Sequence, residues 1–372
     1  MDSKKFNKYK TASDILKSAL LLVKKISVEK LSISEISYIS DEFILNKLNS
    51  VYKNLDKGLS MPTSISYNKI VAHNNPIKNN DYILKNNDII RIEMACHIDK
   101  CSVTLGDTIK IGDDEFKNKK LMKIARKAVD LSLRFIDEDV DIVKFNSILH
   151  SYIKSNNLYL IKRPYVFDES GVSIRYDWCQ KDNEKFLEQS WIVRNDNQLE
   201  LNDSEDDLDD FDLELNYRFN VGNIYHFEIA FSDDNSKSYI SDITPTLYQK
   251  TNRFYSLKSK FSKQIMSNLK NKKLNYIWSI NQLDMPLVRI KLGLKECLDH
   301  DVIRSLGIIE NKGNIIRLKW SVCVRENGPY VLTSPYNIDE LNYENISLNP
   351  ELESLSEIQI KFDNRKSVPK NL

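Results

Sequence analysis

Apolar residues recur every three or four positions in four stretches of the chain, which is the spacing of one face of an α-helix. The first predicted helix begins near Ser13, a residue type favoured at helix N-caps, and a second helical stretch covers 28–56. The other two predicted helices are 117–136 and about 142–153. The pattern therefore predicts two pairs of helices in the first half of the chain.

Between and after these helices the pattern changes to short runs with the alternation of half-buried strands. Residues 88–111 predict an antiparallel hairpin that turns at Asp99-Lys100, and the apolar positions of 65–71 mark a strand pair before it. Further strand-like runs lie at 224–231, 315–324 and 330–333. This mixture of helices and strands predicts an α+β fold, in one large domain or two similar halves.

The composition excludes several classes of protein. The chain has 372 residues, of which 41% are apolar and 29% charged, so it can bury a core. No apolar run approaches the roughly 18–20 residues of a membrane span, and the polar N-terminus lacks the apolar segment of a secretory signal. The five scattered cysteines favour reduced thiols in the cytosol. The nine glycines form neither a dinucleotide-binding nor a P-loop motif.

Charge is segregated along a chain whose net charge is only +1. Residues 243–283 contain no acid, and aromatic residues are interleaved there with eight cations. The cations are Lys250, Arg253, Lys258, Lys260, Lys263, Lys270, Lys272 and Lys273. Such a segment suits contact with RNA, since cations neutralise phosphates and exposed rings stack on bases; a solvated helix face is the alternative.

Residues 200–214 are acidic, which predicts a disordered, solvated loop, with a docking segment for a basic partner as the alternative.

Several motifs resemble those of one protein family. They are Lys57-Gly-Leu-Ser-Met-Pro-Thr-Ser-Ile-Ser-Tyr-Asn68, Val71-Ala-His-Asn-Asn-Pro76, Asp81-Tyr-Ile-Leu-Lys-Asn-Asn-Asp88, and Asn327-Gly-Pro329 followed by Thr333-Ser334. They resemble the methionine aminopeptidases and, within that group, the proliferation-associated, ErbB-3-binding proteins. The resemblance covers about residues 8–345.

The resemblance implies a pita-bread fold, the methionine-aminopeptidase-like and creatinase-like arrangement of two pseudo-symmetric αβ halves around a central sheet. Within the helical insert that the resemblance places at 248–312, Leu294–Leu298 and Val302–Leu306 are expected to form two short helices. The expected units are a flexible basic arm at 1–10, the pita-bread domain at 11–247 and 313–345, a helical, winged-helix-like insert at 248–312, and a polar tail at 346–372.

Active members of this family hold two divalent metals with two aspartates, a histidine and two glutamates. The resemblance maps the aspartates onto Glu93 and Thr104, and the glutamates onto Glu228 and Lys319. The histidine is expected within 172–186, where the chain has none. Because the positions of Thr104 and Lys319 supply no anionic donor, the resemblance implies a vestigial pocket with no metal cofactor and no catalytic residues.

Three further expectations concern this pocket, of which His73 is also a member, and its surroundings. Lys319 should form an ion pair with Glu93 or Glu228 in place of the metals. His73, which matches the family's substrate-side histidine, should be a structural histidine. Asp107 follows Thr104 by three residues, so on a strand it should face the other side and cannot replace the lost aspartate.

The resemblance implies a non-catalytic, RNA-binding protein that docks on the large ribosomal subunit near the polypeptide exit tunnel. The expected partners are ribosomal RNA and tunnel-exit ribosomal proteins, with a role in ribosome biogenesis or translation regulation. The protein is expected to be a cytoplasmic monomer without a membrane partner, and a nuclear or nucleolar location stays open. Two alternatives are a divergent metal-dependent methionine aminopeptidase and a peptide- or protein-binding adaptor without RNA contact.

Overall fold

The computed structural model describes residues 1–77, 81–112, 119–136, 140, 142–161, 172–176 and 218–336. Within this part of the chain, the central element is an eight-stranded antiparallel sheet of order β1-β3-β4-β13-β7-β5, in which β14 also pairs with β13 and β6 with β7. Its strands are β1 (Lys57–Tyr67), β3 (Ile89–Ile98), β4 (Cys101–Lys110), β5 (Tyr159–Leu160), β6 (Val172–Tyr176), β7 (Ile224–Ser232), β13 (Ile315–Arg325) and β14 (Gly328–Thr333).

The predicted hairpin at 88–111 is confirmed as β3 and β4, paired in continuous register from Ile89–Lys110 to Ile98–Cys101. Asp99 and Lys100 both have positive φ, 49° and 64°, which is the conformation of a type I′ turn. That turn matches the right-handed twist of the strands it connects and so fixes the register of the hairpin.

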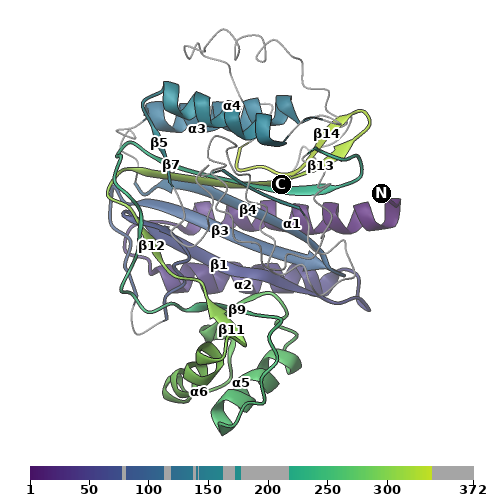
Figure 1. Cartoon of the computed structure of the whole chain (residues 1–372), viewed down its shortest axis with the longest axis vertical. Helices are drawn as coiled ribbons and strands as arrows, with labels where there is room; N and C mark the ends of the chain where they lie inside the picture. Colours follow the sequence, from purple (N-terminus) through teal and green to yellow (C-terminus); the bar gives the residue numbers. More distant parts are fainter. Residues whose placement is uncertain are drawn as a thin grey trace, which may run out of the picture.

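Four helices cover one face of the sheet. The helices are α1 (Ser3–Ile26), α2 (Ile33–Ser50), α3 (Lys119–Phe135) and α4 (Ile142–Ser155). Ile92 and Met94 of β3 belong to the core under α1 and α2, and Leu318 and Trp320 of β13 to the core under α3 and α4. Figure 1 shows the two helix pairs over the two ends of the sheet. Because side chains alternate along a strand, the residues between these apolar positions face the opposite side.

The expected flexible arm at 1–10 is wrong. Helix α1 already begins at Ser3, with the Asp2 side chain accepting the Lys4 N–H as an N-cap. Tyr9 is fully buried, and Lys8 forms an ion pair with Asp99 in the β3–β4 turn. The packing of this first turn on the sheet therefore overrides its polar composition.

The sequence pattern also misplaced the starts of the first two helices. Ser13 lies inside α1, where its hydroxyl donates to the Leu332 carbonyl of β14. The second helix is shorter than the predicted 28–56, because Ser32 caps α2 by accepting the Glu35 N–H. The predicted helices at 117–136 and 142–153 are confirmed as α3 and α4.

The insert contains a sheet as well as helices. Its elements are β9 (Leu247–Lys250), α5 (Lys260–Asn271), β10 (Ile277–Ser279), the 3₁₀ turn η5 (Ile280–Gln282), α6 (Leu287–Asp299) and β11 (Ile303–Ser305). The three strands pair antiparallel in the order β10-β9-β11. The helix predicted at Val302–Leu306 is therefore wrong, since that stretch contains β11, whereas Leu294–Leu298 lies within α6. The β-branched Val302 and Ile303 favour the extended strand.

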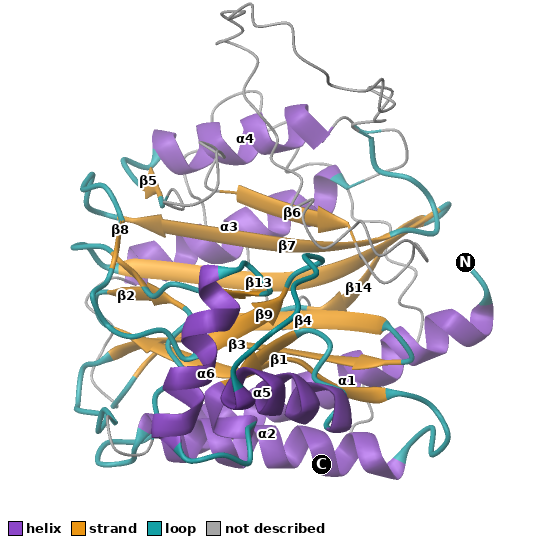
Figure 2. Cartoon of the chain, turned by 60° about the horizontal axis from the view of Figure 1, so that its bottom comes forward, coloured by secondary structure: helices purple, strands orange, loops and turns teal. Residues whose placement is uncertain are grey.

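The insert ends before the predicted boundary at 312. Strand β12 (Ile309–Glu310) pairs with β2 (Ile70–Ala72) and β8 (Tyr239–Ile240), which belong to the body of the molecule. Helices α5 and α6 project from the end of the molecule that holds β1 and α2 (Figures 1 and 2). They cross closely at Gly293, where a Cβ atom would lie 2.7 Å from the backbone carbon of Phe261.

Two expectations lie outside the described residues, namely the acidic loop at 200–214 and the polar tail at 346–372. Among the helices that the structure does describe, none is long and apolar enough to cross a membrane.

Candidate functional site

Four residues from four neighbouring strands stand in one row across the sheet. Glu93 of β3 pairs with Gly106 of β4, Gly106 pairs with Lys319 of β13, and Lys319 pairs with Glu228 of β7. Directly opposed residues of an antiparallel sheet point to the same face. The row therefore places the side chains of Glu93, Lys319 and Glu228 together on the face opposite α1–α4.

Gly106 leaves space for the lysine in this row. A Cβ atom at position 106 would lie 2.9 Å from the Ile92 carbonyl oxygen and 3.2 Å from the Cβ of Lys319. Because β4 carries no side chain here, the Lys319 stem extends over that strand and reaches Glu93 on the far side.

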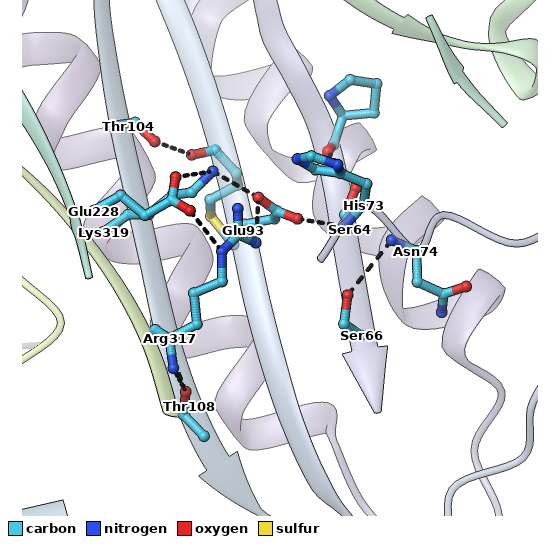
Figure 3. Close-up of polar contacts among 12 residues, drawn as sticks. Ser64, Ser66, His73, Asn74, Glu93, Thr104, Thr108, Glu228, Arg317 and Lys319 are labelled. Atoms are coloured by element: carbon cyan, nitrogen blue, oxygen red, sulfur yellow. Dashed lines mark hydrogen bonds and ion pairs between the residues drawn. The ribbon is translucent and has the colours of Figure 1, made fainter. Parts of the chain in front are cut away.

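The expected ion pair of Lys319 is present with both carboxylates (Figure 3). Its Nζ lies 2.6 Å from Glu93 Oε2 and 3.4 Å from Glu228 Oε2. The resemblance thus located three side chains, distant in sequence, that the fold brings together.

A second cation, Arg317, was missed from the sequence. Its Nη1 lies 2.7 Å from Glu93 Oε2, and its Nε lies 2.9 Å from Glu228 Oε1. The signal that could have found it is the alternation of β13, which puts Arg317 and Lys319 on the same face two positions apart. Two cations and two carboxylates therefore form one closed, charge-balanced group.

Burial and mutual attraction determine the ionisation of this group. Glu93 is 2% exposed and Arg317 is 4% exposed. Burial by itself would raise the pKa of Glu93, but the charges of Arg317 and Lys319 outweigh it and hold that pKa well below its ordinary value. Burial would likewise lower the pKa of Arg317, and the two carboxylates instead raise it. Burial and the nearby Arg317 charge lower the pKa of Lys319, although both carboxylates oppose that shift. Glu93 is thus held in its ionised form by the two cations.

Thr104 and His73 border this group in different ways. The Thr104 hydroxyl donates to the Met94 carbonyl at 3.5 Å, and its carbonyl accepts the hydroxyl of Thr333 at 2.6 Å. The backbone N–H of His73 donates to Glu93 Oε1 at 2.9 Å, while its ring Nδ1 lies 3.1 Å from the Gly307 carbonyl oxygen. His73 therefore contributes its backbone to the group, and its ring contacts the chain beside the insert.

Asp107 lies on the other face of the sheet, as expected. Its carboxylate forms an ion pair with Lys24 of α1 and is 1% exposed. Burial raises the pKa of Asp107, and the Lys24 charge opposes that rise. Asp107 therefore joins α1 to β4 and cannot serve the opposite face.

These residues do not fit a pair of divalent metals. A metal site needs lone pairs from carboxylate or imidazole groups, and an ammonium or guanidinium offers none. Lys319 and Arg317 also bind the carboxylate oxygens that a metal would need. In the described part of the chain, no group of three or more His, Cys, Asp or Glu side chains could hold a metal ion. The expected histidine position, near Trp178, lies outside that part.

Comparisons of the sequence with known proteins found similar proteins. Residues 7–189 match the model of metallopeptidase family M24. The ERBB-3 binding protein 1 of Arabidopsis thaliana is 25% identical over 364 residues, which cover 95% of this chain and 86% of that protein. The chain is thus similar to the ErbB-3-binding proteins over most of its length.

Solved structures with this fold match nearly the whole chain. The structure of a thermophilic Arx1 matches with a TM-score of 0.79 at 19% identity, over 97% of this chain and 100% of the other. The methionine aminopeptidase of Rickettsia prowazekii matches with a TM-score of 0.52 at 13% identity, over 90% of this chain and 98% of the other. The predicted pita-bread fold is thereby confirmed.

The eight cations of the predicted RNA-binding segment all lie in the insert, but they differ in their contacts. Three are paired with acids: Arg253 with Asp301, Lys272 with Asp284 and Lys273 with Asp56. The other five are exposed and form no ion pair with any described residue. They are Lys250, Lys258, Lys260, Lys263 and Lys270.

Removing the Lys319 ammonium should strongly destabilise the protein. We expect Lys319→Ala to lower the free energy of unfolding by about 3–5 kcal/mol, because two buried carboxylates then share one cation. Urea unfolding measures the change, with exposed Lys295→Ala as the control, expected within about 0.5 kcal/mol of wild type. The double variant Lys319→Met/Glu228→Gln keeps the charges balanced and should recover much of the loss. A single-variant loss below about 1 kcal/mol would contradict a buried, coupled group.

The same ion group also predicts how the stability of the protein changes at acidic pH. Since the pKa of Glu93 is depressed in the folded state, its stabilisation is complete above the unfolded value of about 4.3 and is lost as pH falls toward the folded value. Between about pH 4.3 and pH 3, the free energy of unfolding of the wild type should fall by up to about 1.4 kcal/mol per pH unit more than that of Glu93→Gln. Unfolding free energies of both proteins from pH 6 to pH 3 test this, and parallel curves would refute it.

Proposed function

We propose that this chain is a non-catalytic, ribosome-associated RNA-binding protein. It docks on the large ribosomal subunit near the polypeptide exit tunnel and acts in ribosome biogenesis or translation regulation. The partners are ribosomal RNA and tunnel-exit ribosomal proteins. The observation that carries the binding half of the proposal is the face of exposed, unpaired lysines on the projecting insert.

The ion group at the centre of the sheet supports the proposed loss of catalysis. In a metal-dependent peptidase the metals activate water and polarise the scissile carbonyl. Here Lys319 and Arg317 neutralise the remaining carboxylates, Glu93 and Glu228, at 2.6–2.9 Å. A divergent aminopeptidase would have to break this buried group before binding its first metal ion, which disfavours that alternative.

Contact with RNA is supported by how α5 is built. Ile265 and Leu269 are buried against the rest of the insert, and Lys260, Lys263 and Lys270 fall on the opposite side of the helix. Because these exposed lysines form no ion pair with a described acidic residue, a phosphate group does not have to displace one in order to bind them. A row of such cations binds a phosphate backbone and releases its counterions.

The position of the insert suits a large, flat partner. It projects from the body (Figure 1), and five of its lysines are exposed. The body supports it through Asn75, which accepts the hydroxyl of Ser279 at 2.7 Å on its side chain and that of Thr246 at 2.6 Å on its carbonyl. A rigid attachment lets the insert dock without losing freedom between the two parts.

Binding should depend steeply on salt and on these lysines. If about five cations neutralise phosphates, the logarithm of the ribosome association constant should fall against the logarithm of salt concentration with a slope of about −4 to −5. Lys258→Gln/Lys260→Gln/Lys263→Gln should make that slope shallower by about two to three units, because each contact contributes about one. Co-sedimentation with large subunits over a salt series measures the slope.

The matched control removes three exposed lysines from elsewhere, Lys10→Gln/Lys25→Gln/Lys30→Gln, and should change the slope by less than about one unit. Equal loss from both triple variants would indicate general electrostatic attraction. Unchanged binding in the insert variant would contradict RNA contact through this face and would favour the peptide- or protein-binding adaptor.

A further inference from the structure

The interleaved aromatic residues of the insert differ in how far the structure buries them. Tyr248, Tyr276 and Trp278 are buried, with the tyrosine at 248 stacked on the tryptophan at a centroid distance of 5.3 Å. Phe261 is only partly buried. Phe254 differs from all of these, because its side chain is 96% exposed.

The segment that carries Phe254 is fixed on both sides. Before it, the Thr251 N–H donates to the Val302 carbonyl at 3.0 Å. After it, the ring of Tyr255 stacks on that of His300, with centroids 3.5 Å apart and planes within 12°. Phe254 is therefore held outward by an anchored loop.

The loop is anchored again where it enters α5. The backbone N–H groups of Lys258 and Ser259 donate to the two carboxylate oxygens of Glu296 in α6, at 2.7 and 3.0 Å. These contacts tie the loop to the helix pair before any partner arrives. Little conformational freedom remains to be lost when the exposed ring is covered.

The surroundings of Phe254 indicate what kind of partner would cover its exposed ring. Burying a phenylalanine ring is favourable, and this ring forgoes that gain in the free protein. Lys250 and Lys258, close to it along the loop, are exposed and form no ion pair with a described residue, whereas Arg253 beside it pairs with Asp301 at 3.8 Å. A flat aromatic ring among cations matches a base and its flanking phosphates, since a base stacks on the ring while the cations neutralise the backbone.

We propose that Phe254 stacks on an unpaired base of the RNA that the insert lysines bind. The ligand class is a nucleotide in a single-stranded loop, bulge or end, because bases within a duplex are already stacked on their neighbours. The inference rests on the proposed RNA-binding function and adds to it a preference for unpaired over double-helical RNA.

The test compares two RNA probes by fluorescence anisotropy, a single-stranded 12-mer and a blunt duplex of the same length. Phe254→Ala should weaken binding of the single strand by about 5- to 150-fold, the contribution of one base–aromatic stack, and should barely affect the duplex. The salt slope should stay unchanged, because no charge is removed. Phe254→Trp should retain binding and Phe254→Leu should lose it, since only the former can stack.

The matched control is Val288→Ala, which shortens an apolar side chain that is 70% exposed on α6 and should leave both affinities unchanged. Wild-type affinity in Phe254→Leu would overturn the inference, because a general apolar contact would then suffice. Wild-type affinity in Phe254→Ala, with lysine-dependent binding intact, would overturn it while the proposed function stands. If the wild-type protein binds neither probe nor the ribosome, the proposed function itself falls.

Discussion

The ion group formed by Lys319 and Arg317 with Glu93 and Glu228 is the interaction on which the rest of the structure depends. It joins β3, β13 and β7 across the middle of the sheet, where the two helix-covered halves meet. Each member is buried, so each needs the others: removal of one cation leaves a carboxylate without compensation in a region of low dielectric constant. Gly106 makes the arrangement possible, because only a residue without a side chain lets the lysine extend over β4.

In the proposed function, this constraint separates the role of the body from that of the insert. The body keeps the fold of a metallopeptidase, while the polar face that would perform catalysis is closed by its own salt bridges. In the proposed function the body supports the insert. The features suited to binding, namely the unpaired lysines of α5 and the exposed ring of Phe254, lie on the part that projects from it (Figure 1).

Much of this arrangement could be predicted from the sequence. The β3–β4 hairpin was predicted from alternation and from Asp99-Lys100, because a two-residue turn fixes its own register. The meeting of Lys319 with Glu93 and Glu228 came from the family resemblance, since no local pattern relates residues more than 80 positions apart. Arg317 was missed because the resemblance assigned it no role, although its position on β13 is determined by alternation.

The wrong predictions share one physical cause, which is tertiary packing. Residues 1–10 are polar and basic, yet Tyr9 and Lys8 contact the sheet and extend α1 to Ser3. Val302–Leu306 follows a helix in the sequence and contains both apolar and polar residues. It nevertheless forms strand β11, because the edge of β9 is available for pairing. In both places a partner far away in the sequence selected the local structure.

The central claim is that protein cations replaced the metal pair, and metal binding tests it most directly. The purified protein is dialysed against Mn²⁺, Co²⁺ and Zn²⁺ in turn, and bound metal is counted by mass spectrometry alongside turnover of a methionyl peptide. The account predicts no stoichiometric metal and no methionine release, also in Lys319→Glu, which still lacks the donors lost at Thr104 and the missing histidine. Two tightly bound ions per chain, with turnover abolished by a chelator, would contradict it.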